Sequence, residues 1–175
     1  MLSGNREDSE DAYVCHECGE VHRGMPLDFS IPAPDLYAGM SEDERANRAL
    51  ISSDQCIVDD RYFYIRGRLE LPIKGTEQCF CFGVWSFVKR ESFDEMTDSW
   101  TTVGRENERG PYPGLLANAL REFPNAYDLP LRVVVQPVGV RPLLFIEEPH
   151  PLSEAQRDGV TMHRAAELSR LMLAG

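Results

Sequence analysis

Two neighbouring apolar stretches, residues 62–73 and 78–88, constrain the fold of this chain more than any other feature. In the first, YFYIRGRLELPI, apolar side chains alternate with tyrosine and charged side chains, which predicts a strand with one buried face. The second, QCFCFGVWSFV, is apolar on both faces, which is typical of a central strand covered on both sides. A turn at Lys74-Gly75-Thr76 separates them. The core of the predicted fold is therefore a sheet.

Shorter patterns predict three further strands. Gln55 to Val58 is a short strand, and Asp59-Asp60 form the turn of a hairpin with residues 62–73. The stretches LRVVVQPVG and RPLLFIEE predict two more strands, joined near Gly139.

Helices are expected beside these strands. A serine followed three residues later by a glutamate is a capping box, and it starts helices at Ser41 and at Ser92. Residues 114–123 suit a helix, although a strand is an alternative there. Residues 153–173 predict a short capped helix, a break at Gly159 and a last amphipathic helix. The loop 104–113 is rich in glycine, proline and charge, so we expect it to be mobile.

The chain of 175 residues has the length of one ordinary domain. Residues 1–12 are acidic and almost free of apolar side chains, which predicts a disordered tail. Residues 13–175 then form a single α+β domain, with a mainly antiparallel sheet, flanking helices and an N-terminal turn like a zinc knuckle.

Charge and hydropathy exclude several classes of protein. The net charge is −11, and the second of the two last helices lacks basic density, so we expect no nucleic-acid binding. No apolar stretch is long enough for a membrane span, and the polar N-terminus does not resemble a secretory signal. With five cysteines, an odd number, the composition favours a cytoplasmic protein with reduced thiols.

The motif CHECGEVH near the N-terminus is the strongest candidate for chemistry. Cys15 and Cys18 have the spacing at which two thiolates bind one metal ion, and the glycine that follows eases the turn. Tetrahedral zinc needs four ligands. His22, Cys56 and His150 are the residues that could supply the others.

Three interpretations of this motif compete. A redox pair is disfavoured, because it needs a cysteine at a helix N-terminus in a βαβ unit, and here the motif follows a polar tail. Structural zinc is the preferred interpretation, ahead of two free cysteines in a turn. Catalytic zinc would also need an open coordination position and a general base, and no base is evident.

The remaining candidates have simpler structural explanations. Cys79 and Cys81 share one strand face and could chelate together, but they suit the core as small apolar residues. The aspartates at 54, 59 and 60 suit turn formation better than acid–base chemistry. Arg66 and Arg68 could bind an anion, although pairing with carboxylates on neighbouring strands is expected first.

As an ordered set, several of these segments resemble a family of bacterial cytosolic proteins known only as a domain of unknown function. The segments are CHECGEVH, SDQCIVDDRYFYIRGRLELPI, FGVWSFV, QPVGVRPLLFIEE and HPLSEAQRDGV. The resemblance covers nearly the whole chain from Tyr13. It implies that the CxxCGxxH, SDxC, RG and HPL motifs belong to the family pattern. Cys56 and His150 are therefore implied as possible partners of the knuckle. It implies no activity or substrate.

The sequence therefore predicts a non-catalytic zinc-binding module that acts through contacts with another protein, in a binding or immunity-type role. This hypothesis rests on a knuckle without an accompanying nucleophile, base and oxyanion site. The alternative is a metal-assisted hydrolase that uses the same cysteines and histidines. A third hypothesis has no metal, with the cysteines packed as apolar residues.

Overall fold

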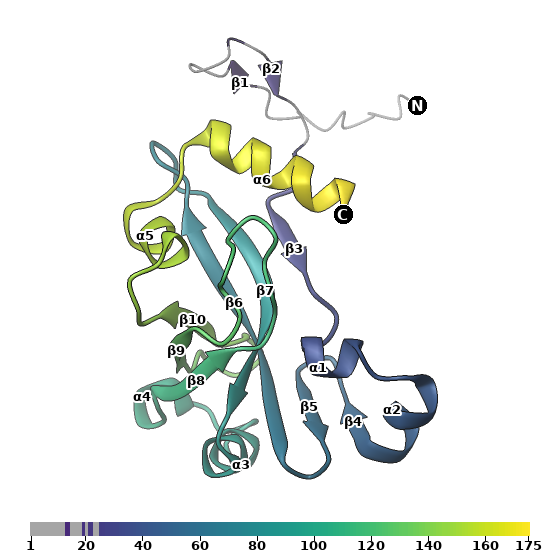
Figure 1. The fold of residues 1–175 in the computed structure, drawn as a ribbon. Coiled ribbons are helices and arrows are strands. Elements are labelled where there is room, and N and C mark those ends of the chain that lie inside the picture. The colour runs from purple at the N-terminus through teal and green to yellow at the C-terminus, as the bar shows by residue number, and fades with distance from the viewer. Residues whose placement is uncertain (1–12, 15–18, 20, 23–24) are drawn as a thin grey trace, which may run out of the picture.

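A computed structural model describes residues 13–14, 19, 21–22 and 25–175 of the chain (Figure 1). The described residues form an α+β fold, as predicted, with an eight-stranded sheet in the order β3-β7-β8-β9-β10-β6-β5-β4. Its strands are β3 (Asp28–Ser30), β4 (Ala49–Ile51), β5 (Gln55–Val58), β6 (Tyr62–Pro72), β7 (Cys79–Val88), β8 (Tyr112–Leu116), β9 (Pro130–Val134) and β10 (Leu143–Ile146). The helices are α1 (Asp35–Ala38), α2 (Glu42–Arg48), α3 (Arg90–Asp98), α4 (Arg105–Glu108), α5 (Pro151–Asp158) and α6 (Met162–Ala174). Separately, β1 (Tyr13–Val14) pairs with β2 (Val21–His22).

The hairpin of β6 and β7 is the centre of the sheet, as the apolar patterns predict. The two strands pair antiparallel from Phe63↔Val88 to Pro72↔Cys79, and nearly every residue of β7 is buried. The opposite edge of β7 pairs with β3 in parallel and with β8 in antiparallel fashion. The predicted short hairpin is also confirmed, since Asp59 and Asp60 have the positive φ values of a tight turn between β5 and β6.

Strands β6 to β10 close into a five-stranded barrel, which the sequence did not predict. Each strand pairs antiparallel with the next, and β10 returns to pair in parallel with β6 through Leu143↔Arg68. The Arg68 N–H donates to the Pro142 carbonyl at 2.9 Å beside this contact. An odd number of strands in up-and-down order makes the closing pair parallel. The predominantly antiparallel sheet is thus closed at strands β6 to β10, and β3, β4 and β5 lie outside the closed part.

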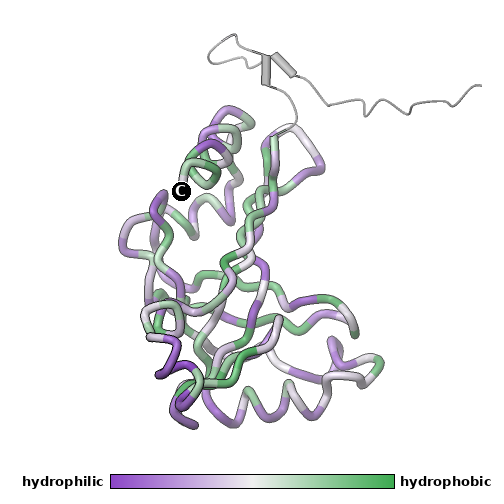
Figure 2. Tube along the Cα trace, turned by 90° about the vertical axis from the view of Figure 1, so that its right-hand side faces the viewer, coloured by the Kyte–Doolittle hydropathy of each residue, from purple (hydrophilic) through white to green (hydrophobic). Residues whose placement is uncertain are grey.

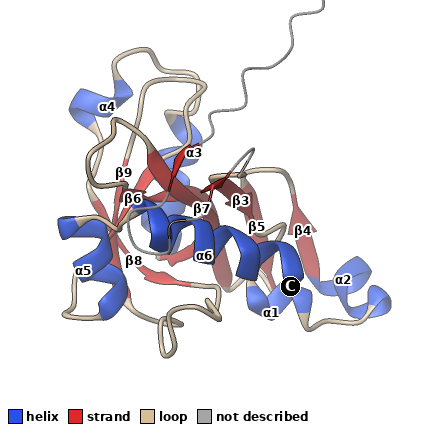
Figure 3. Cartoon of the chain, turned by 90° about the horizontal axis from the view of Figure 1, so that it is seen from above, coloured by secondary structure: helices blue, strands red, loops and turns tan. Residues whose placement is uncertain are grey.

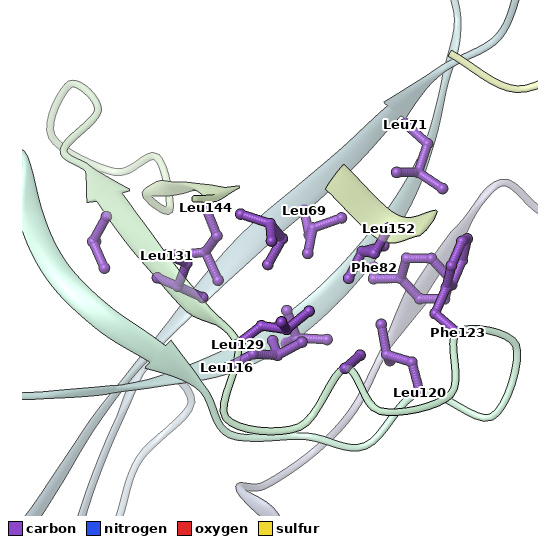
Figure 4. Close-up of a cluster of buried hydrophobic side chains, with 14 of the residues drawn as sticks. Leu69, Leu71, Phe82, Leu116, Leu120, Phe123, Leu129, Leu131, Leu144 and Leu152 are labelled. Carbon is purple, nitrogen blue, oxygen red and sulfur yellow. The ribbon is translucent and has the colours of Figure 1, made fainter. Parts of the chain in front are cut away.

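Gly67 permits the approach of β10 to β6 that closes the barrel. A Cβ atom at position 67 would lie 2.7 Å from Cγ of Leu144, closer than non-bonded carbon atoms can approach. Leu144 is fully buried, and it converges with Leu69 and Leu131 in the barrel interior (Figure 4). The glycine of the predicted RG motif therefore has a steric role in packing.

Helices α5 and α6 pack against the sheet and contribute to its core. Helix α6 lies across the end of the sheet where β3, β6 and β7 meet (Figures 1 and 3), and its buried Ala165 and Leu168 join the main core. Leu152 of α5 is buried in the same core. Hydrophobic and hydrophilic residues alternate along α6 (Figure 2), as expected for a helix with one buried face. The predicted break at Gly159 is confirmed, since α5 ends and α6 begins on either side of it.

The structure corrects the helices predicted at Ser92 and at residues 114–123. Ser92 does not cap α3, which begins after Lys89 and ends at Asp98, so Ser92 is buried inside the helix. The capping box at Ser41 is present, by contrast, with both of its hydrogen bonds to Glu44. The predicted helix at 114–123 is instead the end of β8 followed by turns, because residues 114–116 pair with β7 and β9.

The prediction of a loop at 104–113 is wrong for part of the segment. This segment contains α4 and the first residues of β8, and Arg105 and Tyr112 are buried within it. The Tyr112 hydroxyl donates to a carboxylate oxygen of Glu95 at 2.8 Å, which ties the segment to α3. Polar composition misled the prediction, because the packing depends on partners that are distant in sequence.

Replacing Gly67 with alanine tests the closure of the barrel. The added methyl group would overlap Leu144, so we expect Gly67→Ala to lower the free energy of unfolding by roughly 1–3 kcal/mol. Gly39→Ala is the matched control, because its Cβ would meet only ordinary contacts of 3.6 Å or more. Urea denaturation measures both. Equal, small effects of the two substitutions would contradict the proposed closure.

Candidate functional site

Two strands share the outer edge of β6, and the point where they separate is the candidate site. Strand β5 pairs with residues 62–65 of β6, and β10 pairs at Arg68. Between them the Arg66 N–H donates to the Asp54 carbonyl at 2.9 Å, and the Arg68 N–H to that of Pro142. The chain segments that lead into β5 and β10 therefore lie next to each other. We call this place, where β5 and β10 diverge along β6, the fork.

An ion pair joins the two segments at the fork. Nε of Arg141 donates to Oδ1 of Asp54 at 2.7 Å, and the Ser53 hydroxyl donates to Oδ2 at 2.9 Å. Burial alone would raise the pKa of the Asp54 carboxyl. The hydrogen bonds from Arg141 and Ser53, with the positive charges of Arg141 and Arg66, outweigh that effect and leave the pKa below its usual value. Asp54 is thus an ionised partner of Arg141 at neutral pH.

Arg66 adds a second guanidinium group to the fork. Its two Nη atoms donate to the carbonyls of Ser53 and Ile31 at 3.0 and 3.1 Å, and its guanidinium lies over the Trp85 ring. Its Nε is buried and has no hydrogen-bond partner among the described residues. Burial and the neighbouring charge of Arg141 lower the pKa of Arg66. The fork therefore holds two guanidinium groups close to one carboxylate.

A cavity of about 550 Å³ opens at the fork, a size typical of ligand sites. One wall is β6 with the end of α3 and the loop after it, and the other is the loop from β9 to β10. Apolar side chains contribute much of the lining, and a few polar and charged groups interrupt it. The lining residues are Asp54, Ile65, Arg68, Met96, Ser99, Trp100, Arg105, Val135, Gln136, Gly139, Val140, Arg141 and Pro142.

Arg105 holds the two loops of the cavity together. It is buried, and it donates to the Trp100 carbonyl at 2.8 Å and to the Gln136 carbonyl at 2.9 Å. Two longer bonds of 3.3 Å reach the carbonyls of Pro137 and Val140. Backbone carbonyls thus accept the hydrogen bonds of this guanidinium group. Arg105 is a positioning residue that shapes the cavity.

The structure places the predicted metal ligands in different surroundings. Cys15 and Cys18 lie outside the described residues, and for His22 only the backbone, in β2, is described. Cys56 is 1% exposed and packs in a core cluster that includes Tyr64 and Trp85. Burial raises the pKa of its thiol to about 11, so the thiolate form is disfavoured.

His150 caps helix α5 through its ring. Nδ1 accepts a hydrogen bond from the Leu152 N–H at 3.0 Å, and Nε2 lies 2.9 Å from the Pro124 carbonyl. These partners fit the neutral ring that carries its proton on Nε2. With both ring nitrogens engaged, His150 stabilises the first turn of α5, and the helix begins at Pro151 rather than at the predicted Ser153.

Other predicted roles can be compared with the structure. Cys81 is buried as expected, whereas Cys79 is half-buried at the edge of the core. Arg68 pairs with Asp28 and Glu70, as expected for a strand residue. Within the described part of the chain, no three histidine, cysteine or acidic side chains lie close enough to share a metal ion. No helix there has the length and apolar character needed to cross a membrane.

Several residues of the fork were not found by sequence reasoning. Arg141, Gln136, Trp100 and Arg105 were assigned no site role, and Asp54 was interpreted as a turn former. One clue was available: the segments SDQC, RG and QPVGVR all contribute residues to this one place. Their convergence depends on the closure of the barrel, which no local pattern shows.

The fold and the fork define the class of protein: an α+β protein built on a closed five-stranded barrel, with a cavity where two strands diverge. The chain belongs to a family described as an uncharacterized protein conserved in bacteria (DUF2199), whose model matches residues 14–160. This match confirms the resemblance inferred from the sequence, and it includes the whole fork. No curated protein and no solved structure matches the chain.

Proposed function

We propose that the protein is a non-catalytic binding domain that receives an apolar side chain of a partner protein in the cavity at the fork. The observation that carries the proposal is the cavity itself, with Ile65, Met96, Trp100 and Val135 among its apolar lining residues. A pocket of this volume accommodates a leucine- or phenylalanine-sized side chain with some adjoining backbone.

Exposed apolar residues lie both in the cavity lining and next to it. Trp100 is 38% exposed and Val103 is 91% exposed in the loop after α3. In the loop from β9 to β10, Val138 and Val140 are 40% and 48% exposed. Arg105 ties these two loops to each other, so the four side chains belong to one fixed part of the surface. Aromatic and aliphatic residues in such a position are typical of protein interfaces.

The polar groups of the cavity support binding rather than catalysis. The Ser99 hydroxyl donates to the Glu95 carbonyl at 2.9 Å, so it is used within α3 and the residue that follows it. Asp54 is committed to Arg141 and Ser53. The alternative, a metal-assisted hydrolase, would use Cys15 and Cys18 with His22 or His150 and a water in the remaining position. The helix-capping bonds of His150 disfavour it as a ligand in such a site.

We also propose that Cys15 and Cys18 bind a structural zinc ion, with His22 as a third donor, in a cytoplasmic protein. The spacing of the motif supports this proposal. The contacts of Cys56 and His150 favour His22 over both of them as the next ligand. Zinc here would stabilise the N-terminal segment.

Metal analysis under reducing conditions tests the zinc proposal. We expect about one zinc per chain in the purified protein, and loss of the ion in Cys15→Ser and Cys18→Ser. Cys56→Ala and His150→Asn are the controls, because asparagine still caps a helix, and both should retain the metal. Wild-type protein without zinc would contradict the proposal, and loss in either control would contradict the choice of ligands.

Amide NMR with an apolar probe tests the binding function. N-acetyl-Gly-Gly-Leu-amide should shift the indole N–H signal of Trp100, which lines the cavity, and leave that of Trp85 in place. The Trp85 indole is buried and donates to the Ile31 carbonyl at 3.0 Å. Trp100→Phe assigns the two signals.

Two charge substitutions make the test specific. Val140→Glu should weaken binding about tenfold, because it places a carboxylate at the cavity. Leu173→Glu, a similarly exposed position on α6, should leave it unchanged. Absence of any Trp100 shift at millimolar probe, or equal effects of the two substitutions, would overturn the proposed function.

A further inference from the structure

We propose that the segment bound at the fork is a chain end: the C-terminal carboxylate of the partner pairs with Arg141 while its apolar last side chain enters the cavity. This inference rests on the proposed function and adds the chemical identity of the bound group. It follows from the charges at the cavity, from the Nη groups of Arg141, which have no hydrogen-bond partner among the described residues, and from the extent of the apolar surface.

The charges around the cavity do not balance locally. Arg68 pairs with Asp28 and Glu70. Arg105 and Arg141 also line the cavity, and among the described lining residues Asp54 is the one carboxylate, already engaged with Arg141. The backbone carbonyls that accept from Arg105 carry no net charge and do not neutralise it. A positive site in a chain with a net charge of −11 is a specific local feature and does not reflect overall composition. An anionic ligand would compensate the excess positive charge.

Arg141 has donors available for such an anion. Asp54 accepts from its Nε alone, and its Nη groups have no hydrogen-bond partner in the part of the chain that the structure describes. Its side chain is 37% exposed and lines the cavity. A guanidinium binds a carboxylate best through two parallel N–H donors, and the Nη edge offers such a pair. A ligand carboxylate can therefore bind Arg141 beside Asp54 or in its place.

The extent of the apolar surface favours a chain end over a small free acid. A small acid would fill the cavity and leave Val103 and Val138 uncovered, since neither lines it. When the last residue of a peptide lies in the cavity, the residues before it pass out through the mouth of the cavity. Its preceding residues can then cover the exposed apolar side chains of the two loops. The C-terminus of a protein supplies both the carboxylate and this continuation.

A matched pair of peptides tests the inference. N-acetyl-Gly-Gly-Leu with a free C-terminus should bind about tenfold more tightly than the same peptide with a C-terminal amide. The shift of the Trp100 indole signal measures both affinities. Octanoate is a third probe that carries the carboxylate on an apolar tail without a peptide.

Substitutions at the ion pair separate recognition from structural support. Arg141→Gln should reduce the preference for acid over amide to none. Asp54→Asn should increase it severalfold, because it removes the carboxylate that competes for Arg141. Arg157→Gln, which alters an exposed arginine on α5, is the matched control and should not change the preference. A purely structural ion pair would predict no gain in Asp54→Asn. Thermal unfolding and an unmoved Trp85 signal verify that each variant folds.

The possible outcomes of these titrations differ in what they overturn. Equal binding of acid and amide at Trp100 overturns the carboxylate inference and leaves the proposed binding function standing. If octanoate binds tightly and neither peptide binds, the inference that the ligand is a C-terminus is overturned. The proposal that the partner is a protein is then overturned as well. Absence of a Trp100 shift with all three probes overturns both the inference and the function on which it rests.

Discussion

Strand β6 has a single edge left once β7 has paired along nearly its whole length, and two other strands share that edge. Strand β5 takes residues 62–65 and β10 takes Arg68, so the two must diverge within a few residues. The N–H groups of Arg66 and Arg68 keep hydrogen-bond partners across this gap, from Asp54 and Pro142. Buried backbone N–H groups without partners are costly, so these two bonds determine where the segments before β5 and β10 run.

The candidate site is a consequence of this arrangement. Since Asp54 and Pro142 accept from alternate residues of β6, the side chain of Arg141 comes within 2.7 Å of the Asp54 carboxylate. The gap that separates β5 from β10 leaves the cavity between β6, α3 and the loop from β9 to β10. Gly67 lies between the two arginines and makes room for Leu144 on the interior face. Barrel closure, ion pair and cavity thus share one origin.

Local patterns in the sequence predicted the elements better than their assembly. Alternation over residues 62–73 and the apolar run at 78–88 are properties of single strands, and both strands are present. Closure of the barrel depends on Leu144 meeting Gly67, which lies far away in sequence and leaves no periodic trace. Arg105 illustrates the same limit of prediction from local sequence patterns. Its buried guanidinium is satisfied by carbonyls beyond residue 135, whereas its own segment has the composition of a mobile loop. The fork was therefore invisible to local reasoning, although Asp54 and Arg66 had been singled out for other roles.

Scalar couplings across hydrogen bonds test the fork most directly, because they report which carbonyl each amide reaches in solution. Long-range HNCO spectra should connect the Arg66 amide to the Asp54 carbonyl and the Arg68 amide to the Pro142 carbonyl. Both amides should also exchange slowly with solvent, as members of a closed barrel. Rapid exchange at Arg68, with no coupling to Pro142, would show that β10 does not close on β6 and would contradict the account of the site.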